Sequence, residues 1–236
     1  MKMTISGGLL TIVALFGLLT VLLLPLDERL ITATRGGVIR SGPLPGSLAI
    51  VAHRGVWLVL SLAGLSGLGK VLGRHVWRDQ AGTENGAGSL RPLPGAKTVR
   101  FVLPKNVVMC LVREFGWLAS ATALALMASH IIHMLWFRDR PFVSLGFEPL
   151  LAHVRDSSFP SDHVLVGSVA TVFALERSRL SGILCAMIIA AIAFARVASG
   201  LHWYSDTTAG VAVACSSVLA LEYGARRLAS TVVQER

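Results

Sequence analysis

SSFPSDH, residues 157–163, stands directly before the apolar run VLVGSVATVFAL, residues 164–175. Ser161 follows a proline and is a favourable helix N-cap, and Asp162 in the first helical turn suits the positive end of the helix dipole. The stretch therefore predicts the start of an apolar helix with a polar edge. Because polar residues are costly at the border of a membrane, a chemical role for them has to be weighed beside the capping role.

The composition is that of an integral membrane protein. Of the 236 residues, 53% are hydrophobic and only 15% are charged, and the mean hydropathy is positive. A soluble domain of this size is usually far less apolar. The formal net charge of +9 is spread among the hydrophobic segments without a basic stripe, so we expect no nucleic-acid partner. Cys110, Cys185 and Cys215 fall singly in apolar segments, which indicates neither a disulfide framework nor a cysteine metal site.

Six apolar segments predict an all-α fold, a six-span transmembrane helical bundle that forms a single domain over residues 1–236. A hydrocarbon core of about 30 Å needs about 20 helical residues. The predicted spans are 5–25, 47–70, 113–136, 161–177, 180–197 and 206–225. Residues 3–26 carry no formal charge and lack a small-residue cleavage site, so we expect a retained first span and not a signal peptide.

The connection over residues 71–112 is rich in glycine, proline and polar residues. It predicts a cytoplasmic loop, with residues 106–112 as an interfacial helix before the third span. Lysine and arginine are in excess on the side that holds this loop and both termini, and the cytoplasmic side normally carries that excess. Both termini are therefore expected in the cytoplasm. The ends of spans three and five and the starts of spans four and six are then on the outer face.

The conspicuous polar residues lie at the outer ends of those four spans. They form FRDRPF at 137–142, FPSDH at 159–163 and ARVASGLHWYSD at 195–206. Taken singly, each has a structural explanation. Arg138 and Arg140 fit interfacial snorkelling, and the spacing of four between His202 and Asp206 is common in helices. Arg196 is harder to explain in this way, because an arginine that ends an apolar span needs a partner.

Taken together, these residues predict a phosphate site. Arginines bind phosphate oxygens through paired hydrogen bonds, and the free N–H groups at a helix start favour an anion. Two histidines allow covalent catalysis, because a neutral imidazole attacks phosphorus while a protonated one donates to the leaving oxygen. An aspartate one turn from a histidine holds its tautomer and stabilises the charge that develops on it.

The same residues resemble the three motifs of the type 2 phosphatidic acid phosphatase superfamily, K-x6-R-P, P-S-G-H and S-R-x5-H-x3-D. In this chain the motifs read as His133 ahead of Arg140-Pro141, as PSDH at 160–163, and as Ala195-Arg196 followed by His202 and Asp206. The resemblance covers residues 105–225, the motif-bearing core.

The resemblance implies a role for each motif residue. His202 is the nucleophile that forms a phosphohistidine, Asp206 orients it, and His163 protonates the leaving group. The phosphoryl oxygens are held by Arg140, Arg196, Ser161 and the backbone at Asp162. No metal and no other cofactor is implied.

Three positions depart from the family pattern. His133 replaces the lysine, Asp162 the glycine and Ala195 the serine. The PSDH form with RDRPF upstream looks most like the bacterial undecaprenyl-diphosphatase branch. The charge of the missing lysine is expected from a protonated His133 or from Arg138. His130 and His133 as metal or haem ligands are the alternative, for which the helix offers no clear third ligand.

The leading hypothesis is a phosphatase of the bacterial inner membrane that removes the terminal phosphate of undecaprenyl diphosphate, a polyprenyl lipid, for cell-envelope synthesis. Alternatives in the same class are a phosphatase of phosphatidic acid, phosphatidylglycerol phosphate or lipid A, and a lipid phosphotransferase. A transporter or a non-catalytic lipid-binding protein is the alternative of another class. No internal repeat with matching broken helices, the pattern of many transporters, is visible in the sequence.

Overall fold

The computed structural model describes residues 3–40, 44–83, 105–151 and 156–234. Within these ranges the regular structure is helical, without any strand, which confirms the all-α expectation. The helices are α1 (Met3–Leu23), α2 (Asp27–Arg40), α3 (Leu44–Thr83), α4 (Lys105–Leu135), α5 (Pro141–Ser144), α6 (Asp162–Leu175), α7 (Arg179–Ala198) and α8 (Tyr204–Gln234).

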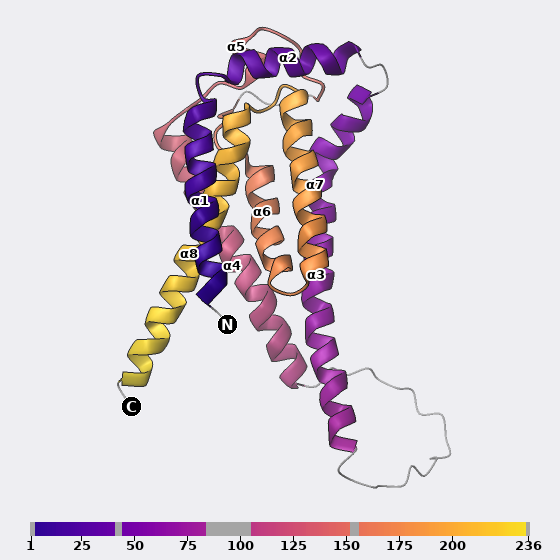
Figure 1. Ribbon diagram of the computed structural model, residues 1–236, viewed down its shortest axis with the longest axis vertical. Helices are drawn as coiled ribbons and strands as arrows, with labels where there is room; N and C mark the ends of the chain where they lie inside the picture. The colour runs from indigo at the N-terminus through magenta and orange to yellow at the C-terminus, as the bar shows by residue number, and fades with distance from the viewer. Residues whose placement is uncertain (1–2, 41–43, 84–104, 152–155, 235–236) are drawn as a thin grey trace, which may run out of the picture.

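The long helices run along the axis of a bundle, and α2 lies across one end of it (Figure 1). The sharp corner between α1 and α2 measures 85°. Pro25 stands at this corner, and a proline disfavours continuation of the preceding helix. The N-terminus of α1 and the C-terminus of α8 both lie towards the other end of the bundle (Figure 1). The end covered by α2 is therefore the end at which α4 and α7 finish and α6 and α8 begin.

Four helices in the described ranges are long and apolar enough to cross a membrane, and the bent pair of α1 and α2 counts as a fifth if it is one span. Every predicted span coincides with a helix, but α6 has only 14 residues. At 1.5 Å per residue it is about 21 Å long, shorter than a hydrocarbon core of about 30 Å. The chain is a multi-pass membrane protein, and six complete crossings exceed what helix length alone supports.

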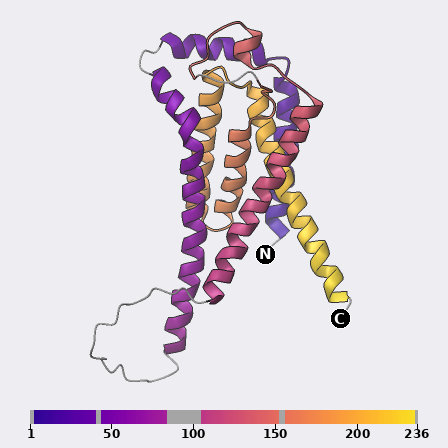
Figure 2. The same ribbon diagram turned by 180° about the vertical axis from the view of Figure 1, so that it is seen from behind.

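The shortness of α6 is explained by its central position. It packs against α3, α4, α7 and α8, and it is visible between them from behind (Figure 2). Leu165 and Val169 join a core cluster with α4 and α8, whereas Val164 and Phe173 join a second cluster with α3 and α7. A helix enclosed by protein on both sides does not depend on lipid to cover its apolar surface.

The structure differs from the expected loop at 71–112. Residues 71–83 continue α3, and residues 106–112, predicted as a separate interfacial helix, are the first part of α4. Residues 84–104 lie outside the described ranges. Charged residues end an apolar run without ending a helix, because Arg, Lys, Gln and Glu are good helix formers. The apolar pattern thus locates the spans but underestimates the length of the helices that contain them.

The amphipathic helix α2 was not expected at all. Its sequence, DERLITATRGGVIR, is too polar for a span. Ile31 is fully buried and packs with Val197 and Trp203, which flank the turn between α7 and α8. Asp27 and Arg35 are also buried, so α2 is a cover over this end of the bundle.

Candidate active site

The turn between α7 and α8 brings two motif residues together. Gly200 has φ +79°, a conformation that favours glycine, and its N–H donates to the Val197 carbonyl at 2.8 Å. The N–H of Leu201 donates to the Arg196 carbonyl at 3.1 Å. These two bonds define a Schellman motif, which ends α7 and folds the chain back. As a consequence, the side chain of His202 lies next to the side chain of Arg196.

Hydrogen bonds define the tautomer of His202. Its Nδ1 lies 2.8 Å from the Ser158 carbonyl, while its Nε2 lies 3.0 Å from Nη2 of Arg196 and 3.2 Å from Nη1 of Arg140. A carbonyl only accepts and a guanidinium only donates, so Nδ1 carries the hydrogen and Nε2 presents its lone pair. Burial, and then the charges of Arg196 and Arg140, hold the pKa of His202 well below its ordinary value of 6.5. The imidazole is neutral at pH 7.

Arg140 is fixed by two segments that are far apart in the chain, residues 156–157 and 201–202. Its Nε donates to Asp156 at 2.6 Å, Nη1 to the Leu201 carbonyl at 2.8 Å, and Nη2 to the Ser157 carbonyl at 3.3 Å. The side chain is 5% exposed. A guanidinium held in this way is preorganised, because little rotamer freedom remains to be lost when it binds an anion.

Four buried side-chain atoms in the described ranges have no hydrogen-bond partner: Nε of Arg177, Nε of Arg196, Oγ of Ser161 and Oγ of Ser199. Two of them, on Arg196 and Ser161, belong to the candidate site. Ser161 is the N-cap of α6, as expected, yet its hydroxyl makes no capping hydrogen bond. Unsatisfied buried polar groups are rare in proteins and call for an explanation. Both atoms belong to residues that the motifs predicted as phosphoryl ligands, and an oxyanion would satisfy them.

Asp206 lies close to His202 without being its direct partner. Oδ2 of Asp206 is 3.7 Å from Nδ1 of His202 and accepts the N–H of Trp203 at 2.7 Å. This last bond is half of a capping box at the start of α8. The group that holds Nδ1 is therefore the Ser158 carbonyl, which sequence reasoning missed because a main-chain carbonyl has no sequence signal.

Arg138 forms ion pairs with two buried carboxylates. Nη1 donates to Asp206 at 2.8 Å and Nη2 to Asp27 at 3.0 Å. Asp27 also accepts from the N–H of Ser205 at 3.1 Å and from its hydroxyl. The charge of Arg138 is neutralised there, so it does not supply the free cation expected in place of the family lysine. Asp27 was missed by sequence reasoning, and its only signal was a charge immediately after an apolar span.

The other predicted residues tie α4 to the start of α6. Nε2 of His133 lies 3.3 Å from the Pro160 carbonyl, and Ser129, one turn earlier, donates to Asp162 at 2.5 Å. The Asp162 carboxylate is thus directed to α4. His163 sits in the first turn of α6, and its charge contributes to the lowered pKa of His202, so the two histidines are near one another.

In the part of the chain that the structure describes, no group of three or more His, Cys, Asp or Glu side chains is arranged to hold a metal ion. His130 is exposed on α4 and His133 is turned to Pro160. The metal or haem alternative thus gains no support from these two residues.

Residues 114–228 match the model of the PAP2 superfamily. This part of the chain, which holds the three motifs, is thus similar to the PAP2 superfamily, and the resemblance predicted from the motifs is confirmed.

Curated relatives and a solved structure agree with this family. The chain is similar to the putative undecaprenyl-diphosphatase YbjG of Escherichia coli (strain K12), with 36% identity over 40% of this chain and 48% of the relative. It is also similar to the undecaprenyl-diphosphatase BcrC of Bacillus subtilis (strain 168), with 31% identity over 41% of this chain and 50% of the relative. The matches thus span about half the length of these relatives.

The fold is similar to that of the first transmembrane PAP2 type phosphatidylglycerolphosphate phosphatase from Bacillus subtilis. The TM-score is 0.54 at 18% identity, over 93% of this chain and 96% of that one. At this identity the likeness concerns the fold alone.

Gly210 allows the close approach of α8 to the start of α6. A Cβ at this position would lie 2.8 Å from the Ser161 carbonyl and 3.3 Å from the Leu165 nitrogen. Both are backbone atoms, so Gly210→Ala must displace the first turn of α6 with Ser161 and His163. We expect about a tenfold loss of rate, because relief of these contacts needs a shift of less than 1 Å, and a full 1 Å misplacement costs about a hundredfold. The measurement is the initial rate of phosphate release from a lipid phosphate by the protein purified in detergent.

Gly224→Ala is the matched control, on the same helix and with no atom within 4 Å of the added Cβ. The glycine-to-alanine change raises helix propensity equally at both positions, so Gly224→Ala should keep the wild-type rate of phosphate release. Equal rates for Gly210→Ala and Gly224→Ala would show that this contact does not position the site.

Proposed function

We propose that the protein is a membrane lipid phosphatase that hydrolyses undecaprenyl diphosphate to undecaprenyl phosphate and inorganic phosphate through a phosphohistidine on His202. The observation that carries the proposal is the neutral imidazole whose Nε2 lone pair faces two buried guanidinium groups. A nucleophile surrounded by anion-binding donors is suited to attack on a phosphoryl group.

In the first step, the lone pair of Nε2 attacks the terminal phosphorus, and the bond from phosphorus to the bridging oxygen breaks. The electron pair of that bond leaves with undecaprenyl phosphate, and His163 donates the proton to this oxygen. Arg140 and Arg196 transfer their hydrogen bonds from Nε2 to the phosphoryl oxygens, and the Ser161 hydroxyl, which has no partner in the free site, donates to these oxygens as well. The Ser158 carbonyl keeps its bond to Nδ1–H, and the nearby Asp206 stabilises the positive charge on the phosphorylated ring.

In the second step, water attacks the phosphohistidine and gives up its proton to the imidazole of His163. The bond from phosphorus to Nε2 breaks, inorganic phosphate leaves, and His202 returns to its neutral form. Phosphate-ester hydrolysis is among the slowest uncatalysed reactions, so the fixed donors around the phosphoryl group are needed in both steps.

The lipid and the location follow from separate arguments. The PSDH form of the second motif and the names of the curated relatives support undecaprenyl diphosphate. The excess of lysine and arginine supports cytoplasmic termini and an outward-facing site in a bacterial inner membrane. The bundle crosses that membrane six times in this proposal, with α6 as a short central crossing covered by protein.

The test is phosphate release by the purified protein from a panel of lipids. We expect kcat/KM for undecaprenyl diphosphate to exceed that for phosphatidic acid, phosphatidylglycerol phosphate and lipid A by about tenfold or more. A chelator should leave the rate unchanged, because the proposed steps use side chains alone.

Each alternative has its own signature in this assay. A higher kcat/KM for one of the phospholipids would assign the activity to that lipid. Phosphate release only after addition of a lipid acceptor would indicate a phosphotransferase. Movement of a labelled lipid across vesicles without phosphate release would indicate a transporter.

A further inference from the structure

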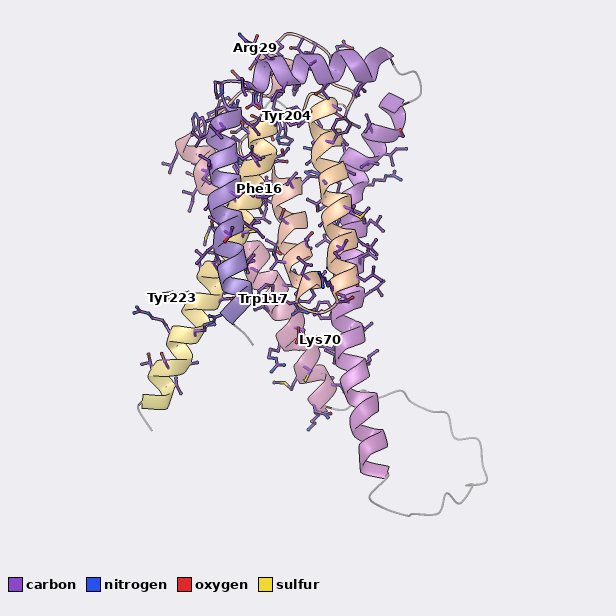
Figure 3. All side chains as sticks on the ribbon, in the orientation of Figure 1. Phe16, Arg29, Lys70, Trp117, Tyr204 and Tyr223 are labelled. Carbon is purple, nitrogen blue, oxygen red and sulfur yellow. The ribbon has the colours of Figure 1, made fainter. Side chains whose placement is uncertain are left out.

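An apolar groove of about 470 Å³ runs along the bundle between α1, α6, α7 and α8. Phe16 of α1 and Ala190 of α7 line opposite sides of it, with Val172 of α6 and Val211 of α8 between them. Figure 3 labels Phe16 on α1 and Tyr204 at the start of α8, and both line the groove. Ala186 and Ala190 are exposed, so the groove opens at the outer surface of the helices, where a bilayer would lie.

The hydroxyl groups along the groove do not make its wall polar. Thr171, Thr207 and Thr208 donate to main-chain carbonyls of their own helices at 2.8, 2.7 and 3.0 Å. Each hydroxyl is thereby satisfied, and the methyl groups of these side chains remain as contact surface. A wall of this kind favours a hydrocarbon ligand over a polar one, because it has few free donors to offer.

One end of the groove is lined by residues that directly follow two candidate site residues in the chain. Val164 follows His163 in the chain, and Thr207 follows Asp206, and both valine and threonine line the groove. Leu175, the last residue of α6, lines its far end. From Val164 to Leu175 the helical rise amounts to about 17 Å. A lipid with its phosphate at His202 would therefore direct its chain into this groove.

The groove is large enough for a segment of a hydrocarbon chain. Its volume of about 470 Å³ lies within the range of about 300–1,000 Å³ for ligand sites.

We propose that this groove binds the part of a single hydrocarbon chain that is nearest to the phosphate of the lipid substrate. The inference deepens the proposed function and rests on it for the position of the phosphate. The groove then contributes to substrate binding, since it contacts the chain segment next to the phosphate.

Ala190→Phe tests the groove at mid-depth. Ala190 lies six residues before Arg196 on α7, about 9 Å along the helix from the arginine. A phenyl group there narrows the groove without reaching a five-carbon chain. We expect the KM for undecaprenyl diphosphate to rise about tenfold or more. The kcat/KM for dimethylallyl diphosphate, a short water-soluble analogue, should stay within about twofold of the wild-type value.

Ala191→Phe is the matched control. Ala191 is the next residue of the same helix, is exposed, and does not line the groove. It should leave the kinetics of both substrates unchanged. An unchanged KM for undecaprenyl diphosphate in Ala190→Phe, or an equal loss with both substrates, would overturn the proposal.

A second measurement does not depend on turnover. A non-hydrolysable polyprenyl diphosphonate with a diazirine in its third isoprene unit is photolysed with the wild-type protein, and the adducts are mapped by mass spectrometry. Adducts on groove residues such as Phe16, Val172 and Phe194 are expected. Adducts confined to α3 and α4 would overturn the groove proposal. If the wild-type protein released phosphate from no lipid, the proposed function would be wrong. The positions of the adducts would still show whether the hydrocarbon chain binds in the groove.

Discussion

His202→Ala is expected to lower phosphate release from undecaprenyl diphosphate by about 10⁴-fold or more. Removal of a catalytic nucleophile has effects of this order in enzymes whose residues act as a unit. The variant loses the only imidazole that lies within hydrogen-bond distance of both Arg140 and Arg196 in the described structure. The measurement is single-turnover phosphate release by the purified protein.

His130→Ala is the control for the loss of a histidine, since His130 is exposed on α4 and takes no part in the proposed steps. It should retain the wild-type rate. Size-exclusion profiles and thermal unfolding should match for both variants and wild type. Substantial hydrolysis by a folded His202→Ala protein would remove the proposed nucleophile.

Arg196→Lys is expected to lower kcat/KM by about 10² to 10³-fold, although it keeps the positive charge. Lysine is a point charge without the planar fork of arginine, so it cannot donate to two phosphoryl oxygens in parallel. The variant also loses the buried Nε that has no partner in the protein. The loss should appear in kcat as well as KM, because these donors act on charge that develops in the transition state.

Arg177→Lys is the matched control for a buried arginine. Arg177 pairs with Glu114 and Glu176, and its guanidinium stacks on Phe173. Figure 3 labels the neighbouring Trp117 and Lys70 far from Tyr204, towards the opposite end of the bundle. The control should lower the unfolding temperature with a small change in kcat/KM. Equal kinetic losses in both variants would mean that Arg196 acts through stability alone.

The convergence of three motifs could be predicted from the sequence. Apolar length located every long helix, and the counting of spans put residues 137–142, 159–163 and 195–206 at one end of the bundle. The structure does bring Arg140, Arg196 and His202 into hydrogen-bond contact. Such a prediction succeeds because the chain can return to the same end only after an even number of crossings.

The partners within the site could not be predicted, because they depend on packing between distant segments. The Ser158 carbonyl holds His202 because the loop before α6 lies against the turn between α7 and α8. The pairing of Arg138 with Asp27 joins residues 111 positions apart, and it needs the corner between α1 and α2. Neither a main-chain acceptor nor a long-range ion pair has a local pattern. The roles of His163, Asp206 and Ser161 in the reaction stay predictions.

The stereochemical course at phosphorus tests the phosphohistidine most directly. The substrate is undecaprenyl diphosphate with a terminal phosphorus made chiral by sulfur and ¹⁸O, hydrolysed in H₂¹⁷O, and the configuration of the released thiophosphate is determined. Two successive in-line displacements, first by His202 and then by water, predict net retention. Net inversion would mean that water attacks the lipid diphosphate directly, and it would contradict the account.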